Sequence, residues 1–303
     1  MDHAIELEAG DYRAVIDLRG AALCRFTWHD EELIWGHSPG GEIRGFQGQL
    51  LLPWPNRVGG GRYVFDGTEH QLEITEPGGG SALHGLVHSL LWRPTTTAPD
   101  QAVLGCTLDG APGYPFRLEV TADYRLDPAA GLTTTVTARN TGTSSAPCGI
   151  GAHPYLKVDT PLDDATLHLP AQLRQPADEH LLPVDSPEPV AGTAHDFRTP
   201  RPVRTATFDT AFTDLRYGPD DRAWTVLSGA ETAVGLWNDR SCGWLQIYSA
   251  DRLVSPDHRA PLAVEPMTCP PNAFATGDAL RVLSPGAGMR ARFGIRRLPP
   301  VTA

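Results

Sequence analysis

Residues 62–74 read RYVFDGTEHQLEI, and this stretch gives the clearest indication of the fold. Asp66-Gly67 separates two runs rich in strand-forming residues, and an Asp-Gly pair in that position is the strongest short-range sign of a β-hairpin. Comparable alternating runs occur along the chain: AVIDLRGAALCRFTW (14–28) with a turn at Gly20, GLTTTVTARNTG (131–142), VGLWNDRSCGWLQIYSA (234–250) and RVLSPGAGMRARFGI (281–295). The last two are also predicted to be hairpins, the first of them with Trp237 and Trp244 flanking its turn.

The distribution of glycine and proline along the chain favours strands over helices throughout. Its 31 glycines and 28 prolines leave little room for a long amphipathic helix. Short strands at such spacing predict an all-β fold, a large antiparallel sandwich with little helix. A proline-rich span from Leu169 to Pro202 could divide the chain into two β domains. Because the span carries apolar residues at intervals, we expect it to lie against a core and residues 1–303 to form one domain; these residues are Leu173, Leu181, Leu182, Val184 and Phe197.

Composition excludes several classes of protein. The net charge of −11 and the single lysine, Lys157, argue against a nucleic-acid partner, which would require clustered basic residues. Five dispersed cysteines without a C-x-x-C pair favour reduced thiols over a disulfide framework. The first residues, MDHAIELEAG, lack the pattern of a signal peptide, and no run approaches the length of a membrane span. A cytoplasmic protein without a membrane partner is expected.

Polar residues interrupt the strand pattern where the backbone is restricted. In LLPWPNRVGGG (51–61), Asn56 and Arg57 stand between two prolines and three glycines. Prolines restrict the approach and glycines allow a sharp turn. Arg57 could therefore present its guanidinium to a hydroxyl or an anion, with Trp54 offering a flat apolar face. A surface turn with a solvated arginine is the alternative.

Two histidines follow a glycine-rich loop in GGGSALHGLVHSLLW (78–92). His84 and His88 are four residues apart, which on a helix would suggest a pair of metal ligands. The flanking glycines and the stop Trp92-Arg93-Pro94 at the end of this region make a helix unfavourable, and no H-E-x-x-H signature is present. No metal site is therefore predicted. A structural histidine is the alternative for His84.

Three more polar positions occur near strand-like runs. In CGIGAHPYLKV (148–158), Pro154 favours an extended backbone at His153, and Tyr155 can stack or hydrogen-bond. In TATFDTAFTDL (205–215), Asp209 lies between two phenylalanines. The alternatives are a core histidine bonded to a backbone carbonyl and an Asx-turn that ends a strand.

The stretch PLAVEPMTCPPNAF (261–274) places a carboxylate, Glu265, at the end of a buried strand and directly before Pro266. With the other positions it supplies one arginine, two histidines and two carboxylates on constrained backbone. This set suits general acid–base chemistry with hydroxyl-binding groups, and it lacks a nucleophile elbow, a phosphate loop or a cysteine ligand set.

In the order in which they occur, these residues resemble the functional positions of the aldose 1-epimerase (galactose mutarotase) family, and the similarity covers nearly the whole chain. The segments PWPNR, ALHGLV and VEPMTCPPNAF are most similar to a bacterial subgroup that includes a proposed sulfoquinovose mutarotase. The chain departs from well-studied members at Met267, where they carry a glutamine, and this leaves the choice of sugar open.

The resemblance implies a β-supersandwich, no cofactor, and interconversion of the α and β anomers of a free aldohexose by ring opening and closure. It implies that Glu265 is the base at the C1 hydroxyl, His153 the acid at the ring oxygen, and His84 the partner of His153. It further implies sugar-binding roles for Arg57 and Asp209, with Asn56 holding the loop; Tyr155 and Trp54 are added as candidate ligands. Glu265 would be charged and His153 protonated, so that activity falls in acid. A small sugar is the expected partner, and a monomer or homodimer the expected state.

Two other functions fit the same residues. An epimerase of an anionic sugar, sulfoquinovose or a hexose 6-phosphate, would need a further arginine aimed at the anion. Arg44, Arg62 and Arg93 are near the relevant loops in sequence, but linear order does not place them in the site. A sugar-binding protein without turnover is the other possibility, because a fold alone does not establish an activity.

Overall fold

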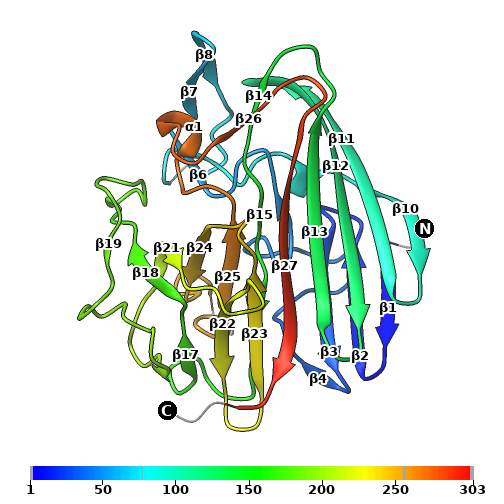
Figure 1. The fold of residues 1–303 in the computed structure, drawn as a ribbon, viewed down its shortest axis with the longest axis vertical. Helices are drawn as coiled ribbons and strands as arrows, with labels where there is room; N and C mark the ends of the chain where they lie inside the picture. Colours follow the sequence, from blue (N-terminus) through cyan, green and yellow to red (C-terminus); the bar gives the residue numbers. More distant parts are fainter. Residues whose placement is uncertain (1–2, 77, 255–256, 301–303) are drawn as a thin grey trace.

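The structure, a computed structural model, describes residues 3–76, 78–254 and 257–300. Within these residues the chain is almost entirely antiparallel β-structure, which confirms the predicted fold class (Figure 1). The helices in the described part of the chain are one 3-10 turn, η1 (Val87–Ser89), and one short helix, α1 (Ala273–Thr276). No helix among the described residues has the length and apolar character needed to span a membrane.

The largest sheet has nine strands among the described residues. In spatial order they are β10 (Arg93–Ala98), β11 (Gln101–Ala111), β12 (Tyr114–Asp127), β13 (Gly131–Asn140), β27 (Gly288–Leu298), β23 (Ala233–Asn238), β22 (Ala223–Ser228), β17 (Thr166–His168) and β20 (Arg201–Pro202). Buried and exposed side chains alternate along β12, so one face of the sheet lies on the core and the other faces solvent.

A second sheet, of eight strands among the described residues, carries or borders three of the polar positions predicted from sequence, His153, Asp209 and Glu265. Its strands are β19 (Glu188–Pro189), β18 (Ala171–Arg174), β21 (Asp209–Leu215), β24 (Trp244–Tyr248), β25 (Leu262–Met267), β15 (Gly151–Ala152) and β5 (Leu50–Leu51), with β16 (Tyr155–Leu156) also paired to β25. All six residues of β25 are buried, as expected of a strand covered on both faces.

The remaining strands form smaller sheets. They are β1 (Ala4–Ala9), β2 (Tyr12–Asp17), β3 (Ala22–Trp28) and β4 (Glu31–Glu32) in one sheet, and the pairs β14 (Ala146–Cys148) with β26 (Arg281–Leu283), β6 (Arg57–Gly59) with β9 (Ser81–Leu83), and β7 (Arg62–Phe65) with β8 (Thr68–Gln71). Side chains from the four-stranded sheet and both large sheets belong to one contiguous hydrophobic cluster that extends from Leu7 to Ile295.

Local hairpin predictions are confirmed. β7 and β8 pair through the Asp66-Gly67 turn, in which both residues have positive φ, the conformation of the tight turns that join twisted strands. β2 and β3 pair around Gly20, and residues 131–140 form β13.

The two hairpins predicted nearer the C-terminus are wrong. β23 and β24 do not pair with each other: β23 lies between β22 and β27, and β24 lies between β21 and β25 in the other large sheet. Likewise β26 pairs with β14, whereas β27 pairs with β13 and β23. Alternation along a strand shows which face is buried, but it does not identify the neighbouring strand, which tertiary packing selects.

The proline-rich span is irregular, with three short strands. Phe197 is fully buried, as predicted, whereas Val184 is 54% exposed and does not reach the core. Leu181 and Leu182 are half-buried.

Candidate active site

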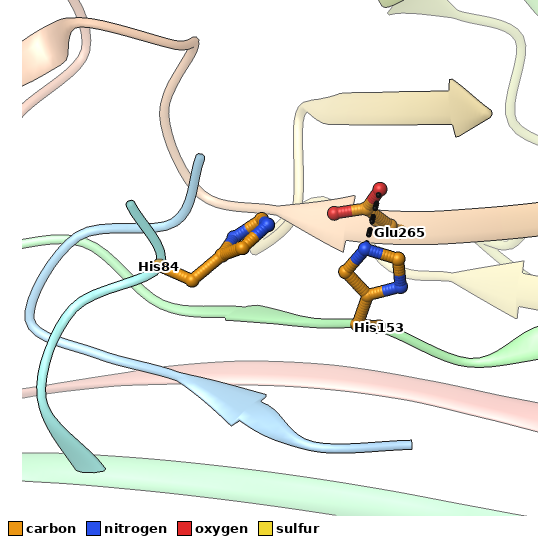
Figure 2. Close-up of side chains that lie close together, drawn as sticks. All are labelled: His84, His153 and Glu265. Atoms are coloured by element: carbon orange, nitrogen blue, oxygen red, sulfur yellow. Dashed lines mark ion pairs between the residues drawn. The ribbon is translucent and has the colours of Figure 1, made fainter. Parts of the chain in front are cut away.

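Strand register brings His153 and Glu265 together although 111 residues separate them in the chain. Two pairs fix the register, Gly151 with Met267 and Tyr155 with Ala263. The unpaired position midway between them places His153 across from Glu265. The His153 Nε2 atom lies 3.3 Å from Glu265 Oε1, and both side chains are buried (Figure 2).

Pro266 explains the interruption of the ladder at this point. The amides of Val264 and Thr268 donate to the carbonyls of Pro154 and Ile150, at 3.0 and 2.9 Å. The same alternation would direct the amide of residue 266 to the strand that carries the histidine, but proline has no N–H. β15 and β16 are therefore two short pieces with His153 in the gap.

A tight backbone clamp holds His84. Its amide donates to the Asn56 carbonyl at 2.9 Å, and the Asn56 amide donates to His84 Nδ1 at 3.2 Å. A ring nitrogen that accepts a backbone N–H is unprotonated, so the neutral ring carries its proton on Nε2. Burial, followed by the charges of His153 and Arg57, lowers the pKa of His84 well below its usual value. His84 is thus a neutral hydrogen-bond donor.

Gly85 is required beside this clamp. It has φ of +72°, and a Cβ there would lie 2.1 Å from the Leu52 carbonyl oxygen. Only glycine allows this approach of the two backbone segments.

The protonation of the central pair differs from the sequence-based expectation. Burial raises the pKa of Glu265 well above its usual value; Asp209 adds to this rise and Arg57 opposes it. Burial lowers the pKa of His153 to about 3. The protein alone therefore favours a neutral carboxyl beside a neutral imidazole. The neutral pair and the ion pair of carboxylate and imidazolium carry the same number of protons. Transfer of one proton across the 3.3 Å between Glu265 and His153 therefore converts one form into the other without exchange with solvent.

Arg57 begins β6 and is 7% exposed. Its Nε and Nη2 donate to the two carboxylate oxygens of Glu76 at 2.8 and 2.7 Å, a bidentate ion pair. The side-chain oxygen of Asn56 accepts the amide of Arg57 at 2.9 Å. Asn56 therefore holds this loop through both backbone and side chain. A solvated surface arginine is excluded.

Asp209 begins β21 and is held by Gln246, whose Nε2 donates to Asp209 Oδ1 at 2.7 Å. Gln246 is directly opposite Glu265 in the pairing of β24 with β25. Both Asp209 and Gln246 line a cavity of about 150 Å³. Gln246 was not predicted from the sequence; the available signal was an amide side chain within an apolar strand.

Three buried polar atoms in this region have no hydrogen-bond partner among the described residues: His153 Nδ1, Glu265 Oε2 and Gln246 Oε1. Buried polar groups are almost always paired, and unpaired ones need an explanation. A polyhydroxylated ligand would supply both donors and acceptors to such atoms.

Two candidate sugar ligands, Trp54 and Tyr155, are engaged in contacts within the protein. Trp54 is 3% exposed and packs against Tyr114 and Phe274, so its faces belong to the core. Tyr155 is 1% exposed, stacks on His153 with ring centroids 4.9 Å apart, and donates its hydroxyl to the Gly45 carbonyl. These contacts give Tyr155 a supporting position behind His153.

Phe46 is a further residue that the sequence did not reveal. Its ring is half-buried and lies 4.5 Å from the His84 ring and 6.1 Å from the His153 ring, measured between centroids. Its φ of +59° is unusual for a phenylalanine. Phe46 covers the two histidines from one side and contributes an apolar wall.

By residue type, His84, His153 and Glu265 could also hold a metal ion, since their candidate ligand atoms all lie within 4.8 Å of one another. His88 is not part of this group; its ring lies against Phe46. The same three residues are those that acid–base chemistry requires.

Comparison with known proteins agrees with this geometry. The family model described as aldose 1-epimerase matches residues 3–296. The chain is 34% identical to the uncharacterized protein YihR of Escherichia coli over 293 residues, which cover 96% of this chain and 92% of that protein. It is 31% identical to human galactose mutarotase over 48% of this chain and 43% of that protein.

The fold is also similar to that of a solved aldose epimerase homologue from C. elegans, with a TM-score of 0.88, 15% identity, and coverage of 99% of this chain and 100% of that one. The family match spans both histidines, the arginine loop and the carboxylate strand. The chain belongs to the aldose 1-epimerase family and is an isomerase with mutarotase-like chemistry.

Proposed function

We propose that this protein interconverts the α and β anomers of a free aldohexose without a cofactor. The observation that carries the proposal is the buried His153–Glu265 pair, with 3.3 Å between Nε2 and Oε1. The hydroxyl oxygen and the ring oxygen of a cyclic aldose are both bonded to C1. A base for one and an acid for the other must therefore lie side by side, as these two groups do.

In the proposed reaction, which starts from the ion-pair form of the two side chains, the Glu265 carboxylate accepts the proton of the C1 hydroxyl while the His153 imidazolium donates a proton to the ring oxygen. The C1–O5 bond breaks as the C1–O1 double bond forms. Rotation about C1–C2 presents the other face of the aldehyde, and the reverse transfers close the ring. His84 donates a hydrogen bond from Nε2 beside His153, while Arg57 and Asp209 hold sugar hydroxyls.

The surroundings of the three arginines considered from sequence favour an uncharged sugar as the substrate. Arg44 pairs with Asp257, Arg62 donates to Gln71, and Arg93 is exposed on β10 of the nine-stranded sheet. One observation favours an anionic sugar as second candidate. Burial raises the pKa of Asp209, and the charges of Arg57 and of the exposed Arg252 oppose that rise, so a second guanidinium lies near this carboxylate.

Polarimetry on freshly dissolved α-anomers tests the proposal. Glucose and galactose should reach anomeric equilibrium faster with the protein than without it, and glucose 6-phosphate and sulfoquinovose should be poorer substrates. Binding of sugars without any acceleration would instead establish a sugar-binding protein.

Chelation should leave the activity unchanged. The acid–base set needs no metal, so prolonged dialysis against EDTA followed by polarimetry should return the original rate. A loss of rate on chelation, restored by added zinc, would show that His84, His153 and Glu265 are metal ligands.

Arg57→Met should raise KM, with a smaller fall in kcat, if the contact is equally good in the ground and transition states. Arg62→Met is the matched control, because it removes an exposed arginine from the neighbouring hairpin. A fall in kcat at unchanged KM would show that Arg57 stabilises the transition state.

A further inference from the structure

Glu76 determines how the arginine of the site is presented. It takes Nε and Nη2 of Arg57 in a bidentate pair, at 2.8 and 2.7 Å. The remaining nitrogen, Nη1, is 3.5 Å from the Asn56 side-chain oxygen, which is longer than a good hydrogen bond. Because the guanidinium is planar and its fork is fixed by Glu76, Nη1 and the second N–H of Nη2 form the edge that remains available to a ligand.

Backbone hydrogen bonds around Glu76 fix the position of this carboxylate. The carbonyl of Glu76 accepts the amides of Gly79 and Gly80 at 3.0 and 2.8 Å, and its amide donates to Ser81 at the start of β9. A Cβ at Gly79 would lie 2.6 Å from Glu76 Oε2. Glycine at that position leaves room for the carboxylate beneath the turn.

The ion pair of Arg57 with Glu76 also carries no net charge as a whole. The side chain of Arg57 is 8% exposed and that of Glu76 is 20% exposed, so solvent screens the pair only in part. A buried guanidinium without a partner attracts carboxylates, phosphates and sulfonates. With Glu76 in place, an anionic group approaching Arg57 would also meet a carboxylate.

We propose that Glu76 is a positioning residue that aims Nη1 of Arg57 at a sugar hydroxyl and, by cancelling the charge of Arg57, selects uncharged sugars over anionic ones. This inference rests on the proposed function and adds the substrate class to it.

The test uses the full-length protein with Glu76→Gln, assayed on glucose and on glucose 6-phosphate. Loss of a charge-assisted pair should raise KM for glucose roughly tenfold or more, with a smaller change in kcat. The ratio of kcat/KM for glucose 6-phosphate to that for glucose should rise, and this gain should shrink as salt is added.

Two further variants complete the test: one separates the position of the Glu76 carboxylate from its charge, and the other is a control outside the site. Glu76→Asp keeps the charge but shortens the side chain, so KM for glucose should rise while the preference for the uncharged sugar remains. Glu31→Gln makes the same chemical change at an ion pair with Arg297, outside the site residues, and should alter neither KM nor the ratio.

The inference is overturned if Glu76→Gln leaves both KM and the substrate ratio at wild-type values, or if Glu31→Gln changes them equally. If the wild-type protein does not accelerate mutarotation of any aldose, the proposed function fails on its own. Calorimetric titration of Glu76→Gln and Glu76→Asp with glucose and glucose 6-phosphate then still decides the role of Glu76 from binding alone.

Discussion

Glu265→Gln should still bind sugar while kcat falls by at least ~10²-fold, the low end for removal of a positioned base. The amide keeps the size and most of the hydrogen-bonding capacity of the carboxyl group, but it cannot accept the C1 proton. Because Glu265 is 2% exposed within β25, the neutral amide should not weaken the fold. The measurement is the mutarotation rate by polarimetry, with the melting temperature as a check on folding.

The pH profile gives a second check. The pair carries one proton above the pKa of His153, about 3, and below the raised pKa of Glu265. The kcat/KM of the wild type should therefore be flat in this range and fall at higher pH, when the pair loses its proton. Residual activity of Glu265→Gln should lack this alkaline limb, since only His153 then titrates. A near wild-type rate with the limb intact would make Glu265 structural, and Asp209 would be the next candidate for the base.

His153→Asn should lower kcat by roughly 10²–10⁴-fold with a smaller effect on affinity, because the proton for the ring oxygen is lost. Asparagine preserves a polar side chain across from Glu265 but cannot transfer a proton at neutral pH. Polarimetry gives kcat, and calorimetric titration with the sugar gives affinity.

His168→Asn is a matched control for this variant. His168 is half-buried in β17, its Nδ1 contacts the Trp224 carbonyl at 3.1 Å, and it lies in the other large sheet. Its replacement should leave kcat unchanged. If His153→Asn retained a near-normal kcat, another residue would protonate the ring oxygen, and His84, with its proton on Nε2, would be the first to test.

Local signals in the sequence predicted strands well and their partners only in part. The Asp66-Gly67 hairpin forms because two residues with positive φ decide it locally. The segments around Trp237 and Trp244 carry equally clear alternation, yet their strands enter different sheets. Pairing between distant strands depends on how sheets stack around a common core, which no short stretch specifies.

The polar positions show the same limit. The sequence showed polar side chains on restricted backbone at Arg57, His84, His153 and Glu265, and the structure brings the last three together. Phe46 and Glu76 were missed because their importance comes from contacts with residues distant in the chain. Burial likewise favours the neutral forms of His153 and Glu265 where charged forms were expected, since sequence does not reveal the depth of a side chain.

The gap in the ladder beside Pro266 has a consequence for how such a protein can evolve. Side chains alternate between the two faces of a strand, so a single inserted or deleted codon within β25 or the β15–β16 segment would turn the acid or the base to the opposite face. Arg57, His84 and Phe46 instead lie on or beside loops and short connections, where changes in length are better tolerated. Mutation can therefore change which sugars fit while the acid and the base keep their positions.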